Sequence, residues 1–361
     1  MAELTTVSFG PQHPVLPEPI HLDLELKDEK VVRAVPSIGY VHRGLEKLVE
    51  KRDFKQFIYV AERVCGICSF GHGWGYAKAV EGLMEIDVPR RASYLRTIWH
   101  ELSRLHSHLL WLGLGADALG FESLFMHCWR LRETILDIFE ETTGGRVIFS
   151  VCEVGGVRRD LTDAMKKSIE ERLTGLRKEI EEMASVFLYD DPIQTRLEGV
   201  GILSMNEAMD LGCVGPMARA SGVPNDYRMA DDDGAYRDLG FHPVLEQTGD
   251  CLARTKVRIR ELYQSIDIIL GALENLPEGA IASPVRGVPP KGEFFTRVEQ
   301  PRGEAIYYIK GNGTKNLERF RLRTPTNCNI AALVKMLQGC DLADVPNIIL
   351  TIDPCISCCE R

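Results

Sequence analysis

The order of apolar and polar residues along the chain predicts a short β-hairpin followed by a series of helices. Residues 20–26, Ile-His-Leu-Asp-Leu-Glu-Leu, alternate with the period of a half-buried strand, and a second apolar run follows a polar turn. This pattern predicts a hairpin over about 20–35. From Leu45 the apolar positions recur at helical spacing as far as Cys65. Further helices are predicted over 90–112, 121–141, 160–188, about 244–273 and 331–337.

The last third of the chain predicts a second hairpin. Residues 276–303 are rich in proline and glycine, which favours a loop. Two apolar runs then flank the turn sequence Gly311-Asn-Gly and predict a hairpin over about 304–322. No internal repeat or low-complexity linker separates these segments. We therefore expect one domain over residues 1–361, mainly α-helical, with a small β-layer contributed by both ends of the chain.

Composition and charge narrow the class of protein. The chain has 361 residues, of which 45% are hydrophobic and 26% charged, as in globular proteins and unlike disordered or fibrous ones. Its net charge of −9 argues against non-specific binding to nucleic acid. The first residues have no basic segment followed by an apolar one, and no apolar run reaches the roughly 18 residues of a membrane span. We expect a soluble chain in a reducing cytoplasm that reaches a membrane only through partners.

Cysteine is the unusual residue of this composition, with eleven copies. An odd number in a long chain argues against a complete disulfide framework. Four of the cysteines form two CxxC units, Cys65-Gly-Ile-Cys68 and Cys355-Ile-Ser-Cys358. Four thiolates are a soft donor set, suited to zinc, nickel or an iron–sulfur cluster rather than to magnesium or calcium. The two units are 287 residues apart, whereas the two halves of a zinc ribbon are separated by about 15–20 residues.

Spacing alone leaves other interpretations of these cysteines open. A structural zinc site, or two unrelated buried pairs, would produce the same spacing. A thioredoxin-like redox motif fits less well because no βαβ pattern surrounds either pair. Elsewhere, His100 and His106 lie six residues apart rather than four, which excludes the helical zinc-protease motif. The chain contains no Walker A motif and no dinucleotide fingerprint, so we expect no bound nucleotide.

Longer motifs around the cysteines resemble those of a known family. Residues 63–72, Arg-Val-Cys-Gly-Ile-Cys-Ser-Phe-Gly-His, and residues 353–358, Asp-Pro-Cys-Ile-Ser-Cys, resemble the two signature motifs of NiFe-hydrogenase large (catalytic) subunits. Residues 10–19, 42–47 and 212–222 are similar to the membrane-associated, energy-converting branch (the Ech and CO-induced type). That branch is related to the 49 kDa-type subunit of respiratory NADH:quinone oxidoreductase, which lacks the four cysteines. Since this chain keeps all four, the resemblance favours a nickel–iron centre over a quinone site.

The resemblance covers nearly the whole chain and implies a helical domain whose two terminal segments meet at a metal site. It implies nickel bound by Cys65, Cys68, Cys355 and Cys358. Cys68 and Cys358 would also bridge to an iron ion that carries carbon monoxide and cyanide. Because splitting dihydrogen requires a base beside a Lewis-acidic metal, the resemblance makes the sulfur of Cys355 the first proton acceptor.

Four further residues receive roles from the same resemblance. Glu18 would relay protons, Arg302 would lie over the metal site as a catalytic and cofactor-binding residue, and His72 and Asp353 would support the ligands from outside. Three of these roles have plainer alternatives: Glu18 as a surface residue of a proline-rich loop, Arg302 as a solvent-exposed turn residue, and His72 as a buried structural histidine.

The resemblance also implies a second divalent ion, magnesium or iron. Glu46 matches a family position that helps to bind such an ion. The family's usual C-terminal histidine has no counterpart here, so an ion pair between Glu46 and a basic group is the alternative. His13 and His42 lie in motifs shared with the quinone-type relatives and are minor candidates for proton transfer.

The sequence therefore predicts the catalytic subunit of a multi-subunit NiFe hydrogenase, coupling ferredoxin-linked proton reduction to ion translocation by membrane subunits. No iron–sulfur motif remains beyond the two CxxC units, so electrons would pass through a small subunit with a [4Fe-4S] cluster and ferredoxin-type subunits. The complex would lie on the cytoplasmic side of the membrane, with this chain peripheral. The alternatives are a non-catalytic, quinone-site-like subunit and a soluble cofactor-reducing hydrogenase. Nucleic acid is not an expected partner.

Overall fold

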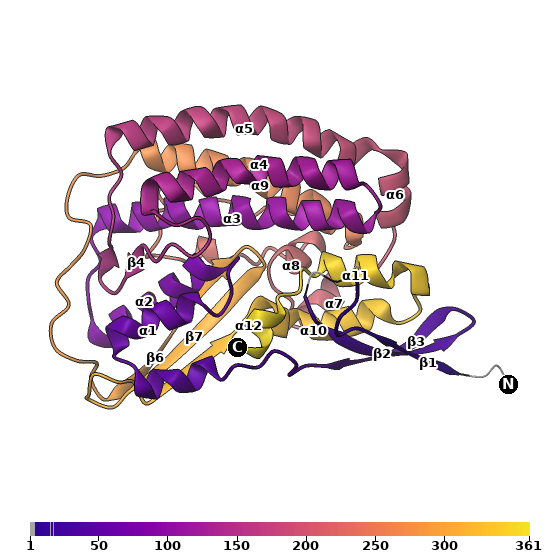
Figure 1. Ribbon diagram of the computed structural model, residues 1–361, viewed down its shortest axis with the longest axis horizontal. Coiled ribbons are helices and arrows are strands. Elements are labelled where there is room, and N and C mark those ends of the chain that lie inside the picture. The colour runs from indigo at the N-terminus through magenta and orange to yellow at the C-terminus, as the bar shows by residue number, and fades with distance from the viewer. Residues whose placement is uncertain (1–3, 15, 17) are drawn as a thin grey trace.

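A layer of long helices forms one side of the molecule in the computed structural model, which describes residues 4–14, 16 and 18–361. Figure 1 shows these helices stacked above a layer of shorter helices and antiparallel strands. The long helices are α3 (Arg90–Ala118), α4 (Glu122–Thr143), α5 (Asp163–Tyr189) and α9 (Cys251–Glu274). Helix α3 packs against both α4 and α9 and is buried along most of its length. The four helices predicted in these regions are confirmed.

The first sheet contains the predicted N-terminal hairpin. Strands β1 (Thr5–Phe9), β2 (His21–Lys27) and β3 (Lys30–Ser37) pair antiparallel in the order β1-β2-β3. The turn between β2 and β3 places Asp28 and Glu29 at positive φ. The hairpin is confirmed, whereas β1 was not predicted. Its short segment carries no clear alternation, since only its last residue is buried.

The second sheet corrects one prediction. Strands β6 (Gly292–Gln300), β7 (Gly303–Gly311) and β8 (Arg319–Arg323) pair antiparallel in the order β6-β7-β8. The hairpin over about 304–322 is confirmed as β7 and β8. The loop predicted over 276–303 is wrong from Gly292 onward. Only the last three residues of β6 are buried, so its sequence lacks the regular alternation of a half-buried strand.

The segment between Leu45 and Cys65 is also more broken than predicted. It forms a 3₁₀ helix, η1 (Leu45–Lys51), followed by α1 (Phe54–Glu62), and a loop then leads to Cys65. Asp53 separates the two helices because its side chain accepts a hydrogen bond from the Lys55 amide and caps α1. Helix α2 (Ser69–Met84) begins directly after Cys68.

Shorter elements complete the fold. They are β4 (Cys152–Glu153), β5 (Gly156–Val157), α6 (Asp191–Leu197), α7 (Met205–Asp210), α8 (Pro216–Ala220), η2 (Tyr227–Met229), α10 (Pro325–Leu337), η3 (Leu342–Asp344), α11 (Val345–Thr351) and α12 (Ile356–Glu360). Helix α10 begins six residues before the predicted short helix. Helix α12 packs against α10 and returns the end of the chain to the middle of the molecule (Figure 1). The mainly α class with small antiparallel sheets is confirmed, and no described helix is long and apolar enough to cross a membrane.

Candidate metal centre

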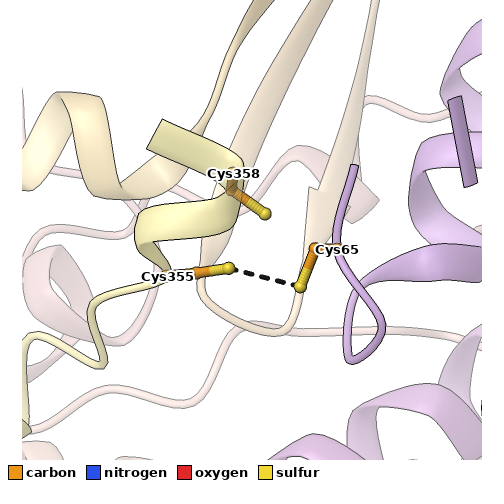
Figure 2. A group of neighbouring side chains, drawn as sticks. All are labelled: Cys65, Cys355 and Cys358. Carbon is orange, nitrogen blue, oxygen red and sulfur yellow. Dashed lines mark hydrogen bonds between the residues drawn. The ribbon is translucent and has the colours of Figure 1, made fainter. Parts of the chain in front are cut away.

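The two CxxC units meet although they lie at opposite ends of the chain. Cys65 lies in the loop before α2, Cys68 caps the start of α2, Cys355 caps the start of α12, and Cys358 lies within α12. The sulfurs of Cys65, Cys355 and Cys358 all lie within 4.8 Å of one another, with 3.2 Å between those of Cys65 and Cys355 (Figure 2). All four side chains are at most 4% exposed.

The sulfur of Cys68 is not one of the three that lie within 4.8 Å of one another, but Cys68 lies beside them. Its amide donates a hydrogen bond to the Cys65 sulfur at 3.5 Å, and its own sulfur accepts one from Arg302 at 3.3 Å. The thiols also share protons. The S–H groups of Cys355, then Cys358 and Cys68, donate to Cys65 and hold the pKa of its thiol well below the ordinary value. Burial raises the pKa of the Cys358 thiol.

This donor set fits a soft metal ion. A cation that replaced the shared protons would satisfy four buried sulfurs at once, and metal binding at thiols proceeds by such a release of protons. Cys68 stands at the N-terminus of the 16-residue helix α2, where the free backbone N–H groups favour negative charge. Four thiolates without a cation would instead be costly at this burial.

His72 supports the cysteines from α2. Its Nε2 lies 3.2 Å from the sulfur of Cys358, and its Nδ1 faces the side chains of Gln300 and Tyr307 at 3.2 and 3.0 Å. Burial lowers the pKa of His72 to about 4, so the ring is neutral at physiological pH. Since Gln300 and Tyr307 can donate to Nδ1, the ring proton lies on Nε2 and is donated to sulfur.

Arg302 lies over the cysteines and is buried. Its guanidinium donates to the sulfur of Cys68 and to the hydroxyl of Ser107, both at 3.3 Å. It also forms an ion pair of 2.8 Å with Asp353, whose backbone carbonyl accepts from Nε at 3.0 Å. Asp353 has positive φ, and in the described part of the chain its Oδ2 has no partner. The solvent-exposed alternative for Arg302 is therefore wrong.

Glu18 faces the start of α12. Its carboxylate accepts hydrogen bonds from the amides of Ile356 and, at 3.0 Å, Ser357. Burial, followed by the negative charge at Cys65, raises the pKa of Glu18, while Arg302 and the two amides oppose this shift. Glu18 also lines an open cavity of about 440 Å³ together with residues 11–14, Leu16 and Pro19. The carboxyl group thus lies between the cysteines and the surface.

Glu46 is neutralised by arginines rather than placed among metal ligands. One carboxylate oxygen accepts from Arg361 at 2.8 Å and from the Leu322 amide at 3.0 Å, and the other accepts from Arg321 at 3.1 Å. Among the described residues, no second group of histidine, cysteine or carboxylate side chains lies close enough together to hold a metal ion. The surroundings of Glu46 therefore do not fit a divalent ion and match the ion-pair alternative.

The two minor histidine candidates lie outside the cysteine group. His42 is exposed, and its Nδ1 lies 2.5 Å from the backbone carbonyl of Glu360. The ring of His13 stacks on Phe9 with 4.1 Å between centroids. His13 lines the cavity beside Glu18, so it stays a prediction as a proton carrier.

Sequence reasoning missed several residues around the cysteines. Ser107 and Tyr307 reach the site from the middle of α3 and from β7, and Thr326 accepts a hydrogen bond from the Cys355 amide at 3.0 Å. None of these residues belongs to a motif with a recognisable spacing. Tyr307 occupies a buried position in the regular alternation of β7, which signals burial but not proximity to the cysteines.

Glu62 is a further residue that sequence reasoning missed. It is buried at the end of α1, three residues before Cys65, and accepts a hydrogen bond from the Ser150 hydroxyl at 2.5 Å. Burial raises its pKa to about 7. The folded chain therefore binds more protons than the unfolded chain between pH 4.5 and 7, and its stability falls as the pH rises through this range.

Replacing Glu62 by glutamine removes this dependence. We expect E62Q to gain stability relative to the wild type from about pH 4.5 to above 7, by on the order of 3 kcal/mol. Denaturant unfolding across this pH range measures the difference. The exposed Glu170→Gln provides the control, which should follow the wild type. A constant difference between E62Q and the wild type would contradict the buried, protonated carboxyl group.

Comparison with known proteins places this geometry in a family. The model of the respiratory-chain NADH dehydrogenase 49 kDa subunit matches residues 118–289 and 283–361, and the model of nickel-dependent hydrogenases matches residues 43–113. The membrane-bound hydrogenase subunit alpha of Pyrococcus furiosus is 38% identical over 98% of this chain and 87% of its own length. The chain belongs to this family of hydrogenase and 49 kDa-type respiratory subunits.

Other relatives represent both branches of the family. The carbon monoxide-induced hydrogenase of Rhodospirillum rubrum is 39% identical over 99% of each chain. An NADH-quinone oxidoreductase subunit of Deinococcus radiodurans is 34% identical over 99% of this chain and 96% of its own. A solved chain of the membrane-bound sulfane sulfur reductase, an archaeal respiratory membrane complex, shares the fold with a TM-score of 0.95, 30% identity and 99% coverage of each chain. Membership of the family supports an oxidoreductase role in a membrane complex.

Proposed function

We propose that this chain is the catalytic subunit of a NiFe hydrogenase that interconverts dihydrogen with protons and electrons. Cys65, Cys68, Cys355 and Cys358 would bind nickel, and Cys68 and Cys358 would also bind the iron that carries carbon monoxide and cyanide. The convergence of the buried sulfurs of Cys65, Cys355 and Cys358 within 4.8 Å, with the buried thiol of Cys68 hydrogen-bonded to Cys65, carries this proposal. The whole chain would act as one domain around this centre.

The NADH-quinone oxidoreductase subunits among the relatives provide the alternative, a non-catalytic subunit of a respiratory complex. Those relatives lack the cysteine site. Here the four thiols are present, buried and supported by His72 and Arg302. A chain without a metal centre would have no need to bury the charged side chain of Arg302 against a group of thiols, because a buried charge has a large desolvation cost. The site therefore favours catalysis.

The residues around the thiols suit the removal of protons. When bound, a nickel–iron centre supplies Lewis acidity and redox flexibility for splitting dihydrogen into two protons and two electrons. The sulfur of Cys355 would take the first proton. Although a hydrogen bond with Cys358 lowers the pKa of the Cys355 thiol, the hydrogen bond with Cys65, burial and the nearby negative charges together raise this pKa well above its ordinary value. Burial likewise raises the pKa of Glu18, so both groups favour their protonated forms. The cavity beyond Glu18 would then release the proton to solvent.

Arg302 would hold anionic groups of the centre on the side of Cys68. Its guanidinium is fixed by Asp353 on one side and by the hydroxyl of Ser107 and the sulfur of Cys68 on the other. A fixed cation with several N–H donors can hold anionic iron ligands and stabilise negative charge that develops during the reaction.

Electrons would leave through partner subunits. We propose a small subunit with a [4Fe-4S] cluster, ferredoxin-type iron–sulfur subunits and ion-translocating membrane subunits, with this chain peripheral on the cytoplasmic side. The relatives support an assembly of this kind because they include membrane-bound hydrogenase and formate hydrogenlyase subunits. The reaction would be proton reduction with ferredoxin as the electron donor.

Elemental analysis of the purified native complex tests the proposed function. The proposal predicts about one nickel ion bound to this chain and iron in excess of the iron–sulfur clusters. Zinc in place of nickel, in a complex that still transfers electrons to its acceptor, would favour the non-catalytic alternative. Loss of nickel on substitution of any one of the four cysteines would assign the metal to this site.

Substitution of Glu18 tests the proton path. We expect E18Q to lower both dihydrogen evolution and deuterium exchange by about 100-fold, because the amide oxygen can still accept the hydrogen bonds from α12 but the side chain cannot take up and release a proton. Nickel content should not change. Glu25→Gln, on the exposed side of β2, provides the control. Full evolution together with full exchange in E18Q would remove Glu18 from the mechanism.

A further inference from the structure

Arg43 links the two cysteine segments through a single guanidinium group. Its Nη1 donates to the backbone carbonyl of Arg63 at 3.1 Å, and its Nη2 donates to those of Val64 and Ser357 at 2.8 and 2.9 Å. Val64 directly precedes Cys65, and Ser357 lies between Cys355 and Cys358. One planar side chain therefore fixes the distance between two backbone segments from opposite ends of the sequence.

The residues on both sides of Arg43 contact the end of α12 through polar groups. The amides of Gly39 and Val41 both donate to the carboxylate of Glu360, the former at 2.6 Å. His42 Nδ1 contacts the backbone carbonyl of Glu360 at 2.5 Å. Further along the same segment, Glu46 pairs with Arg361 at 2.8 Å. Residues 39–46 thus contact α12 repeatedly through polar groups.

Helix α12 requires such contacts. A helix of five residues has too few internal hydrogen bonds to hold its own conformation, so tertiary contacts must fix the positions of Cys355 and Cys358. Thiolates brought together also repel one another. This repulsion would move the two cysteine segments apart, and the guanidinium of Arg43 opposes the movement because it binds carbonyls of both segments. The ion pair between Glu46 and Arg361 holds the end of the helix, at the position where the family resemblance implied a divalent cation.

We propose that residues 39–46 form a polar strap that sets the spacing of the two cysteine pairs, with Arg43 as its central positioning residue. The Glu46–Arg361 ion pair would take the place of a second metal ion in this strap. The inference rests on the proposed function only for the identity of the metal, because the spacing of the sulfurs affects any ion bound by all four.

Titration of the metal-free full chain with Co²⁺ tests the strap, because cobalt–thiolate absorption reports both affinity and coordination. We expect R43Q to bind Co²⁺ at least about 10-fold more weakly than the wild type and with an altered absorption spectrum. R43K should lie between the two, since one ammonium cannot reproduce the planar fork. R33Q is the matched control: Arg33 is an exposed arginine of β3 that pairs with Glu25, and its loss should leave the titration unchanged.

A wild-type affinity and spectrum in R43Q would overturn the proposal. If R43Q does not yield folded chain by circular dichroism, R43K alone decides by the same two readouts. The ion pair is tested by E46Q, R361Q and the double variant: the strap predicts that the double variant weakens Co²⁺ binding less than the sum of the two single effects. Additive effects would show that Glu46 and Arg361 act separately and would contradict their place in the strap.

The metal content of the native complex separates this inference from the proposed function. If wild-type complex contains zinc instead of nickel while R43Q weakens Co²⁺ binding, the proposed function fails and the strap holds. If the complex contains nickel while R43Q binds Co²⁺ as the wild type does, the strap fails and the proposed function holds.

Discussion

Replacing Cys355 by serine is expected to remove nickel from the chain and to reduce dihydrogen evolution by the purified complex to background. The Cys355 sulfur lies 3.2 Å from that of Cys65, inside the buried group of thiols. A serine hydroxyl is a hard donor that stays protonated near neutral pH, so it replaces neither the soft ligand nor the proposed proton acceptor. Nickel content and the rate of dihydrogen evolution with a low-potential electron donor measure the effect.

A cysteine outside the group provides the control for this experiment. Cys340 is partly exposed, and burial raises the pKa of its thiol to about 12, which makes it an unreactive thiol. We expect C340S to keep both nickel and activity. Retention of nickel and of more than a small fraction of the activity in C355S would show that Cys355 is neither a ligand nor the base.

Replacing Arg302 by lysine is expected to lower dihydrogen evolution by about 100-fold with nickel still bound. The arginine makes contacts in three directions, to Asp353, Ser107 and Cys68. Lysine keeps the charge but cannot make these contacts together, so the fixed donors over the site are lost. Steady-state rates and the metal content of the variant separate a catalytic effect from failure to assemble the centre.

Arg302→Met tests how much the ion pair with Asp353 stabilises the fold. Removing the guanidinium leaves the buried charge of Asp353 without its partner, and we expect the free energy of unfolding to fall by about 3–5 kcal/mol. Arg297→Lys, on the exposed side of the preceding strand β6, is the control for both experiments.

For the catalytic prediction, wild-type rates in R302K would show that the guanidinium does not act in the reaction.

The sequence predicted the parts of the fold that local patterns determine. The long helices and both hairpins follow from the spacing of apolar residues, and the CxxC units follow from cysteine spacing. Strand β6 escaped prediction because most of its residues are exposed and its burial depends on pairing with β7. A strand that is stabilised mainly by its neighbours has only a weak signal in its own sequence.

Only those residues of the candidate site that a recognisable motif contains, or that the resemblance assigns, were predictable. Cys65, Cys68, Cys355 and Cys358 stand in recognisable motifs, and the resemblance led from them to Glu18, Arg302 and His72. An ion pair of Glu46 was one of the alternatives, but its partner Arg361 and the contacts of Arg43 were not predictable, because they depend on where α12 lies after folding. The sequence also did not indicate the charged side chains of the interior. Glu101, Glu261 and Arg219 are fully buried in one network, although charged residues in helices usually face solvent.

The distinction between a hydrogenase and a respiratory 49 kDa-type subunit depends on this one group of side chains. The fold and the overall similarity are common to both branches of the family. The feature of this chain that bears on the distinction is the group of buried thiols, next to which Arg302, His72 and Glu18 lie. The central claim is therefore a claim about the metal centre and is best tested there.

Infrared spectroscopy of the purified native complex tests this claim most directly. Carbon monoxide and cyanide bound to iron absorb in a spectral region that is free of protein bands. The account predicts bands from both ligands in the wild type, which disappear in C355S and persist in C340S. A wild-type complex that is fully assembled, holds zinc at the four cysteines and has no such bands would contradict it.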